Sequence, residues 1–353
     1  MRRIPATLLI VALTASALLP ELVFAGVGNG KPHPTRGPRP TPTATATTGP
    51  PATASPTPTA TPTATPSPTP TPTSGGCTLF PADNVWNKPI DTLPARSDSA
   101  SLLNAIGLTT GLHPDFSSLA WNGGLGYGIP YNVVGPATPR YTLSFYYADE
   151  SDPGPYPIPN DPLIEGGSDR HLLAWDTSAC HLYEIFDAER VGSAWTGGSG
   201  ATWDLRSNAL RPDGWTSADA AGLPILPGLV RYDEVAAGAI LHALRFTAPY
   251  TARAYIYPAR HQAGCTTNSR CLPPMGLRVR LKASVDISRF NATNRVILTA
   301  LKRYGMMLAD NGSAWYITGV PDARWNDDDL HLLNGVTGAD FEAVDTSAFF
   351  NGP

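Results

Sequence analysis

The chain has few of the residues from which metal sites and nucleophile motifs are built. Its 353 residues include only 4 Cys and 7 His, with no CxxC pair, HxH pair or HExxH run. The histidines His171, His242 and His261 would bind a metal only if the fold brought them together. The G-x-S-x-G elbow of serine hydrolases and the lysine-bearing P-loop are also missing. We therefore expect neither a metal nor another cofactor.

Basic side chains are scarce as well. The sequence holds 25 Lys and Arg against 29 Asp and Glu, and five basic residues and one acidic residue precede Cys77. The segment from Cys77 to Pro353 therefore carries 20 basic and 28 acidic side chains, a net charge of −8. Such a charge repels phosphate backbones and other polyanions. We expect no nucleic-acid partner, and a strongly anionic substrate is disfavoured.

Long apolar runs are confined to the N-terminus. Residues 1–25 combine a basic start, an apolar stretch and a small-residue site at Ala25, which is typical of a cleaved secretory signal peptide. Pro20 and Glu21 interrupt the stretch, so it is too short to span a bilayer comfortably. The sequence predicts a secreted, extracellular protein without membrane insertion.

Residues 26–76 are rich in Pro and Thr. This composition cannot bury apolar surface and favours extended polyproline II, so it predicts a disordered, semi-rigid linker. The linker would either contact the cell wall or be the remnant of a lost module. Residues 77–353 are enough for one large domain.

All four cysteines lie in that domain. In an oxidising compartment two disulfides are the default. Cys265 and Cys271 are close enough in sequence to close a small loop, which leaves Cys77 to join the N-terminal end of the domain to Cys180.

Strand signals outnumber helix signals in the domain. We predict a mainly β fold, an antiparallel β-sandwich or jelly-roll-like domain with long ordered loops and a few short helices. The expected strands cover 141–147, 239–246, 254–257 and 277–281, and the expected helices cover 97–106, 294–304 and a short segment near 325–329. The turn at Asn311-Gly312 predicts a tight pair formed by strands 306–309 and 315–318.

Residues 170–187 carry the clearest hairpin pattern. If Asp176 lies opposite His181, Leu173 lies opposite Glu184, because antiparallel partners keep a constant index sum. One face then gathers His171, Trp175 and Glu184 with other apolar residues. That face is either a sugar platform with a carboxylate or a second core layer with a buried ion pair.

The stretch 202–247 concentrates polar side chains between glycines and prolines. Its prolines and glycines exclude a helix or central strand over 211–229, so we predict an ordered loop that forms the wall of a site. The alternative is a structural loop whose polar groups cap backbone. In the strand expected next, His242 and Arg245 point to opposite faces unless a bulge re-aims them.

Carboxylates and aromatic rings remain as the chemistry-bearing residues. Glycoside hydrolysis needs two carboxyl groups around a sugar, with rings that stack on it. Glu184 and Asp310 are the first pair expected, and His242 is a candidate base beside Asp219 or Asp310. The full set of candidate catalytic residues is Glu184, Asp310, His242, Asp219 and Asp149, with Glu234 as a further carboxylate. The candidate substrate-binding residues are Trp175, Trp215, Arg245, Asn208, Tyr232 and His171.

The expected partner is thus an extracellular polysaccharide, and the expected activity is that of a glycoside hydrolase. Two alternatives stay open. A non-catalytic glycan-binding or cell-surface module would use the same aromatic rings. A polysaccharide lyase would need a His242 or Tyr232 base, with Arg245 and Asn208 to neutralise a uronate.

Several segments together suggest a family. They are ADNVW, YADESDPGPYPIP, SDRHLLAWD, GWTSADAAGLPILPGLVRYDEV, HALRFT, PPMGLR and YGMMLADNGSAWYITG. In these the chain resembles a family of uncharacterised secreted bacterial proteins, over nearly all of 77–353. The resemblance implies a single domain behind a variable Pro/Thr-rich linker, and it brings no catalytic assignment with it.

Overall fold

A computed structural model describes residues 76–265, 270 and 272–350 of the protein. Within these residues most regular structure is strand, in several small sheets, and the helices are few and short. This confirms the mainly β fold. Most strand pairs among the described residues are antiparallel, and several are parallel. The sandwich or jelly-roll arrangement stays a prediction.

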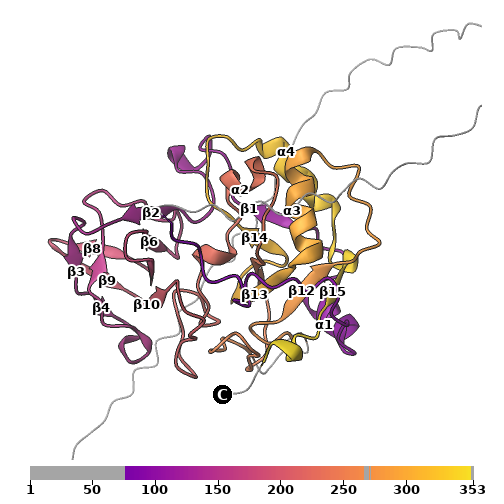
Figure 1. Ribbon diagram of the computed structural model, residues 1–353, viewed down its shortest axis with the longest axis horizontal. Coiled ribbons are helices and arrows are strands. Elements are labelled where there is room, and N and C mark those ends of the chain that lie inside the picture. Colours follow the sequence, from indigo (N-terminus) through magenta and orange to yellow (C-terminus); the bar gives the residue numbers. More distant parts are fainter. Residues whose placement is uncertain (1–75, 266–269, 271, 351–353) are drawn as a thin grey trace, which may run out of the picture. The chain divides into compact units, whose positions relative to one another are not determined.

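The largest sheet, called here the six-stranded sheet, has the order β1-β14-β11-β13-β12-β15. It lies at the right of Figure 1 together with the longest helix, α3. Its strands are β1 (His113–Asp115), β14 (Tyr316–Thr318), β11 (Leu244–Ala248), β13 (Met306–Asn311), β12 (Arg278–Leu281) and β15 (Phe341–Ala343). In the strand β13 every residue from Met306 to Ala309 is apolar and buried, which suits a strand covered on both sides.

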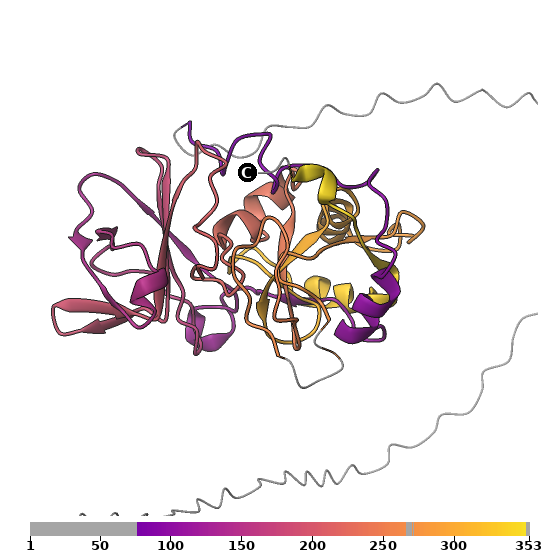
Figure 2. The same cartoon turned by 90° about the horizontal axis from the view of Figure 1, so that it is seen from below.

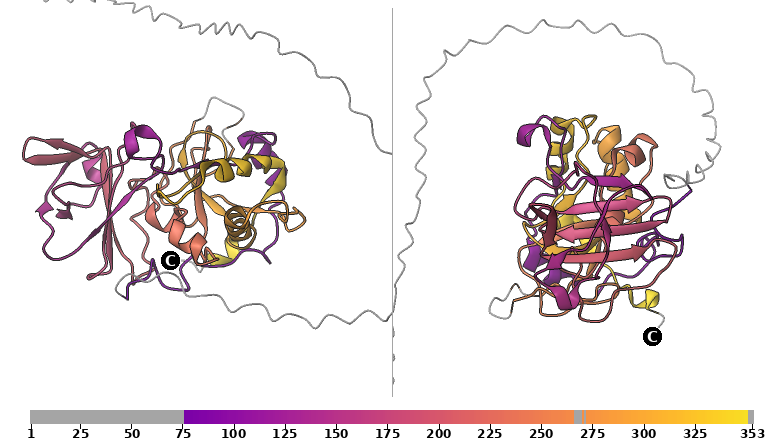
Figure 3. Two further views of the ribbon diagram at one scale, coloured as in Figure 1. Left: turned by 90° about the horizontal axis from the view of Figure 1, so that it is seen from above. Right: turned by 90° about the vertical axis from the view of Figure 1, so that its left-hand side faces the viewer.

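A four-stranded sheet with the order β10-β7-β6-β2 lies at the left of Figure 1, and the right panel of Figure 3 shows its strands side by side. Its strands are β10 (Ser199–Asp204), β7 (His181–Phe186), β6 (Leu172–Asp176) and β2 (Tyr131–Val134). The predicted hairpin is confirmed with its register, because Asp176 pairs with His181 and Leu173 with Glu184.

Two small sheets replace the single strand predicted over 141–147. The paired strands are β3 (Arg140–Tyr141) with β5 (Tyr156–Pro157), and β4 (Ser144–Phe145) with β9 (Ala194–Gly197), which also pairs with β8 (Glu189–Val191). The chain changes its pairing partner between Tyr141 and Ser144. The prediction of one continuous strand was therefore wrong.

The two faces of the four-stranded sheet belong to two hydrophobic cores. Leu173, Trp175 and Leu182 lie in the main core, which also contains the six-stranded sheet, whereas Leu172 and Ile185 lie in a smaller core. Figure 2 shows this sheet nearly edge-on, with the β8–β9 hairpin extending away from the six-stranded sheet. Since the Trp175 face packs inside the protein, the second core layer is the correct alternative for it, and the sugar platform is not formed there.

Four α-helices and six short 3-10 helices occur among the described residues. The α-helices are α1 (Ser99–Ile106), α2 (Tyr232–Ala236), α3 (Ala292–Arg303) and α4 (Asp327–His331). The 3-10 helices are η1 (Asn122–Gly124), η2 (Ala148–Glu150), η3 (Leu226–Gly228), η4 (Leu332–Gly335), η5 (Gly338–Asp340) and η6 (Ser347–Phe349). The helices predicted at 97–106, 294–304 and near 325–329 are confirmed as α1, α3 and α4. Asn291 and Asn326 cap the last two by accepting hydrogen bonds from backbone N–H groups.

Three strand predictions around the six-stranded sheet need correction. The strand expected over 239–246 begins only at Leu244, so His242 precedes it. Residues 254–257 contain a single bridge, between Tyr255 and Met275, instead of a strand. The strands on either side of the Asn-Gly turn do not pair with each other, because β11 lies between β13 and β14. The strand over 277–281 is confirmed as β12.

The disulfide between Cys77 and Cys180 is confirmed, and it ties the start of the domain to the turn between β6 and β7. The predicted pair of Cys265 with Cys271 includes a residue outside the described ranges. The signal peptide of 1–25 and almost all of the 26–76 linker also lie outside them. No helix in the described part of the chain is both long enough and apolar enough to cross a membrane.

Candidate functional site

A bulge in β13 brings Asp310 to the face of the six-stranded sheet that carries Arg245. Along the parallel pair of β11 and β13, Phe246 lies opposite Leu308, but the next residue, Thr247, lies opposite Asp310. One extra residue is thus inserted in β13. Because side chains alternate along a strand, the insertion moves Asp310 onto the side of Thr247 and Arg245.

The bulge is held by the loop 216–222, the central part of the long loop predicted over 211–229. The backbone N–H of Ala221 donates to the carbonyl of Ala309, the extra residue of β13, at 2.9 Å. Gly222 turns the chain with φ at 68°, and a Cβ atom there would lie 2.5 Å from the carbonyl oxygen of Trp215. Glycine is therefore required at this turn. The loop lies against β13 and so forms one wall of the site.

Asp219, from this loop, is paired with Arg245. The guanidinium donates to both carboxylate oxygens, at 3.0 and 2.5 Å, and its third nitrogen donates to the Thr318 hydroxyl at 2.5 Å. All three side chains are buried. A bidentate guanidinium favours the ionised carboxylate. Asp219 is therefore a fixed negative charge beneath the surface.

Asp310 is half-buried and its carboxyl group is hydrogen-bonded to Asp219. One of its oxygens also accepts a hydrogen bond of 3.3 Å from the backbone N–H of Ala220. Burial, and then the negative charge of Asp219, raise the pKa of Asp310 to about 8, although the charge of Arg245 acts in the opposite direction. The two carboxyl groups therefore hold one proton between them at neutral pH.

A cavity of about 330 Å³ opens beside this pair. Phe186 at the end of β7 and Ser199 at the start of β10 come from the four-stranded sheet, and Asp310 comes from the six-stranded sheet. The cavity thus lies where the two sheets meet. Its other side chains with chemistry to offer are Tyr147, Glu150, Asp169 and His261.

Glu150 and His261 lie next to each other at the wall of this cavity. One carboxylate oxygen of Glu150 accepts from the backbone N–H of Thr216 at 3.0 Å and lies 3.7 Å from Nε2 of His261. Nδ1 of His261 donates to the carbonyl of Ala220 at 2.8 Å, so the ring orientation is fixed with Nε2 toward Glu150. The same loop that carries Asp219 thus positions a second carboxylate and an imidazole.

His171 supports the loop from below. Its Nδ1 contacts the Glu165 carboxylate at 2.5 Å and its Nε2 lies 3.0 Å from the carbonyl oxygen of Ala218. Burial lowers the pKa of His171, but the hydrogen bond and charge of Glu165 outweigh it and raise the pKa to about 9. The imidazolium therefore donates to both neighbours, and it holds the residue that precedes Asp219. His171 is a support of the site rather than part of its surface.

Glu184, expected to act with Asp310, lies in the closed interior with an exposed fraction of 0%. Its oxygens accept from the backbone N–H groups of Ile225 and Leu226 at 2.9 to 3.0 Å and from the Trp203 indole at 3.3 Å. Burial raises its pKa to about 7, although the backbone hydrogen bonds lower it. This carboxyl group anchors the end of the long loop, and it does not line the cavity.

His242 was expected beside Asp219 or Asp310, and that placement was wrong. Its Nε2 lies 3.1 Å from Glu234 and 3.0 Å from Arg231, and its Nδ1 lies 2.7 Å from the carbonyl of Ala243. His242 and Glu234 are both buried in this separate cluster. The cause is the late start of β11, which removes His242 from the strand faces.

The remaining candidates are dispersed. Trp175 is buried in the main core, and Asp149 is exposed outside the cavity. Asn208 donates to Asp83, Trp215 packs beside the Arg211 guanidinium, and Tyr232 packs against Trp325. Of the predicted residues, the structure gathers Asp219, Arg245 and Asp310, with His171 beneath them. Glu150 stood out in the sequence only as the neighbour of Asp149, and His261 only as one of three histidines that could have bound a metal.

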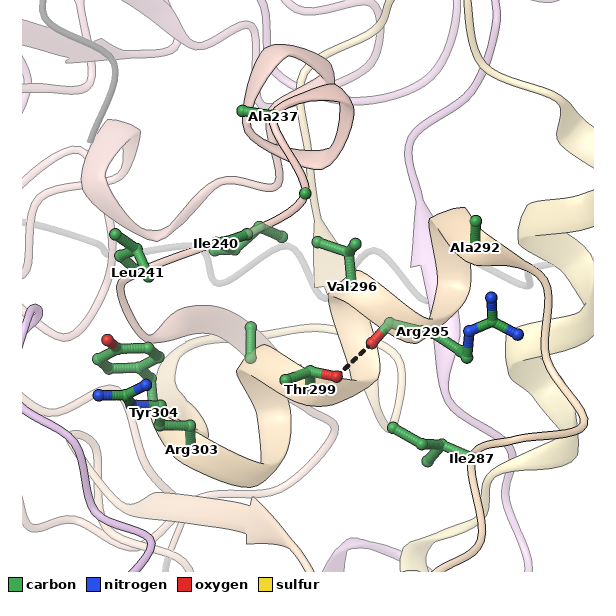
Figure 4. Close-up of a pocket in the computed structure, with 13 residues that line it drawn as sticks. Ala237, Ile240, Leu241, Ile287, Ala292, Arg295, Val296, Thr299, Arg303 and Tyr304 are labelled. Atoms are coloured by element: carbon green, nitrogen blue, oxygen red, sulfur yellow. Dashed lines mark hydrogen bonds between the residues drawn. The ribbon is translucent and has the colours of Figure 1, made fainter. Parts of the chain in front are cut away.

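A larger cavity elsewhere in the molecule is mostly apolar. It measures about 600 Å³ and lies between residues 237–241 and α3, where Ile240 and Val296 face each other (Figure 4). The Thr299 hydroxyl there is occupied by a hydrogen bond to the carbonyl of Arg295 in its own helix. No carboxylate lines this cavity among the described residues. Of these two cavities, the smaller one at Asp219 and Asp310 is therefore the one with acids to offer.

Among the residues that the structure describes, no three His, Cys, Asp or Glu side chains converge as a metal site. Asp219 and Asp310 form only a pair of acids, and Arg245 already neutralises part of their charge. The site is thus equipped for proton transfer by side chains of the chain itself. No protein-family model, curated protein or solved structure matches this sequence.

Proposed function

We propose that this protein is a secreted enzyme that hydrolyses glycosidic bonds of an extracellular polysaccharide, with Asp310 as the general acid. The observation that carries the proposal is the Asp219–Asp310 pair at the wall of an open cavity. A carboxyl group that keeps its proton near neutral pH is what protonation of a glycosidic oxygen requires.

Asp219 and Arg245 prepare this acid. The fixed charge of Asp219 raises the pKa of Asp310, and the bidentate Arg245 keeps Asp219 ionised and in place. When Asp310 gives up its proton, Arg245 limits the repulsion between the two carboxylates. The pair thus combines a proton donor with a support for the charge that the donation creates.

Glu150 is the second carboxyl group that hydrolysis requires. It lines the same cavity, and Thr216 and His261 orient it. In the reaction Asp310 protonates the leaving glycosidic oxygen as its bond to the anomeric carbon breaks. Glu150 takes a proton from the water that forms the new bond to that carbon. One water is consumed, and a new reducing end forms.

The alternatives have less support. Lyase chemistry needs a cation beside the uronate, and no Lys or Arg lines the cavity among the described residues. A binding module needs sugar contacts but has no use for a carboxyl group that stays protonated at neutral pH. The disulfide between Cys77 and Cys180 is compatible with secretion into an oxidising compartment.

The test is an activity screen of the purified protein against cellulose, xylan, chitin, pectin and peptidoglycan. New reducing ends and unsaturated uronates are measured separately, so that hydrolase and lyase products are distinguished. We expect reducing ends from the wild type, loss with Asp310→Asn and Glu150→Gln, and retention with the exposed control Asp161→Asn. Full activity in Asp310→Asn would remove the proposal, and binding without turnover would support the glycan-binding module.

A further inference from the structure

A second cavity, of about 460 Å³, lies over β1 and β14, and we call it the aromatic groove. The side chains used below are His113, Asp115, Trp121, Tyr127, Tyr316 and Asp327, all of which line it. None of them belongs to the site described above.

An exposed but anchored tryptophan forms one side of the aromatic groove. Trp121 is 53% exposed, yet its indole N–H donates to Asp327 at 2.8 Å. Asp327 in turn accepts from the backbone N–H and the hydroxyl of Ser118, at 2.7 and 2.6 Å. The only polar group of the indole is thus used to fix its orientation, while a broad apolar surface stays in water. Such a ring is prepared to stack on a ligand.

Two further rings share the aromatic groove with Trp121. Tyr127 is 50% exposed, and Tyr316 stacks on His113 with ring centroids 4.0 Å apart. Rings of this kind pack against the C–H faces of a pyranose, and the carboxylate of Asp115 can accept hydrogen bonds from its hydroxyl groups. The combination fits a sugar better than an apolar peptide or a lipid.

The aromatic groove and the acid pair lie on the same face of the six-stranded sheet. Asp115 in β1 lies opposite Thr318 in β14, and the Thr318 hydroxyl accepts from Arg245 in β11. Arg245 holds Asp219, which is hydrogen-bonded to Asp310 in β13. Neighbouring strands are about 4.8 Å apart, so β1 and β13, separated by three steps, are roughly 14 Å apart. A short run of linked sugars spans such a distance.

The charges of the two cavities restrict the sugar. The acid pair lies with Glu150 and Asp169, and Asp115 and Asp327 line the aromatic groove. No Lys or Arg lines either cavity within the described part of the chain. A uronate or sulfated chain would meet only repulsion from these side chains.

We propose that the aromatic groove is a distal sugar-binding subsite, and that the substrate is a neutral polysaccharide chain whose scissile bond lies at Asp310. The position of the scissile bond rests on the proposed function. The stacking of sugar rings on Trp121 does not, and it can be tested by binding alone, without turnover. Trp121 and Tyr127 bind sugar rings, and Asp327 is a positioning residue that acts through Trp121.

The experiment measures binding by calorimetry to the Asp310→Asn protein, with neutral cello-, xylo- and chito-oligosaccharides of increasing length as probes. We expect affinity to rise with length, and Trp121→Ala to weaken the longest chains about tenfold, which is what one stacking contact is worth. The disaccharides should be affected much less. Trp121→Phe should keep most of the affinity, because a ring is still present. Asp327→Asn should lower the affinity, because it weakens the hydrogen bond that fixes the Trp121 indole.

The matched control is Tyr250→Ala, which removes another exposed ring that lines neither cavity. Trp121→Ala with wild-type affinity for every probe, or tighter binding of oligogalacturonates than of neutral chains, would overturn the subsite. Length-dependent binding that needs Trp121, in a protein whose wild type cleaves no probe, would keep the subsite and reject the hydrolase. The two proposals therefore fail separately.

Discussion

Glu184 and Asp310 are two acids whose pKa values are both raised, but their surroundings differ: Glu184 is fully buried and Asp310 is half-buried. Burial raises the pKa of Glu184 to about 7, and burial with the charge of Asp219 raises that of Asp310 to about 8. Glu184 uses its oxygens on backbone and indole donors in the closed interior. Asp310 faces another carboxylate at the wall of a cavity.

The raised pKa has a different significance at Glu184 and at Asp310. At Glu184 it records the cost of burying a charge to anchor a loop. At Asp310 it comes with a like-charged partner and access from the cavity, so the proton can be transferred. Access together with an opposing charge, rather than the shift alone, distinguishes a candidate acid from a structural one.

The largest expected effect is a difference in activity between two matched variants, each of which replaces a carboxyl group by an amide. Asp310→Asn should lower kcat by about 10²- to 10⁴-fold, because the general acid is lost. Glu184→Gln should retain activity at temperatures where it is folded, because its side chain does not reach the cavity. The measurement is initial rate on the polysaccharide found in the screen. A loss of equal size in both variants would contradict the contrast.

Stability should respond in the opposite way. In Glu184→Gln the amide oxygen can accept from Ile225 and Leu226, but the NH₂ group then faces the Trp203 indole N–H, and we expect this clash of donors to cost about 1–3 kcal/mol. Asp310→Asn keeps a donor toward Asp219 and removes an acid from a like-charged pair, so it should cost nothing. Urea denaturation at neutral pH measures both. A destabilised Asp310→Asn beside an unaffected Glu184→Gln would reverse the assignment.

The pH dependence sharpens the contrast further. Both acids have a folded-state pKa above the unfolded value, so the folded state holds more protons and stability falls as pH rises. The fall runs from about 4.5 to about 7 for Glu184 and from about 3.8 to about 8 for Asp310. Asp310→Asn should therefore flatten the wild-type stability curve up to pH 8, and Glu184→Gln only up to pH 7. Activity should decline above a pH of about 8, as Asp310 loses its proton.

These pH effects are measured by denaturation at a series of pH values, with the rate profile recorded beside them. A wild-type stability that rises over the same range, or identical curves for the three proteins, would show that neither acid is perturbed by folding.

The smallest effect is expected at Asp149, the acid next to Glu150. Its side chain is exposed and lies outside the cavity. Asp149→Asn should leave activity unchanged and alter the free energy of unfolding by less than about 0.5 kcal/mol. A loss of rate comparable to that of Glu150→Gln would instead assign the role of the second carboxyl group to Asp149.

Part of the candidate site could be predicted from sequence. The stretch 202–247 was expected to form the wall of a site, and Asp219 and Arg245 come from it. Asp310 was expected too, but with Glu184 as its partner. That pairing came from a face with aromatic rings and one carboxylate, a pattern that an internal core layer satisfies equally well. Nothing in the sequence of Glu150 or His261 indicated that they lie next to each other.

The sequence by itself determined the features that depend on near neighbours or fixed spacing. The hairpin register of β6 and β7 and the existence of the helices α1, α3 and α4 are of this kind, whereas Cys77 was matched to Cys180 by elimination. Only the tertiary structure decided which acids meet. Asp219 and Asp310 are joined because β13 carries an extra residue, and the stabilising hydrogen bond comes from Ala221, far away in the chain. Alternation fixes the face of a side chain only while the register is unbroken, and the contacts that favour this bulge are non-local.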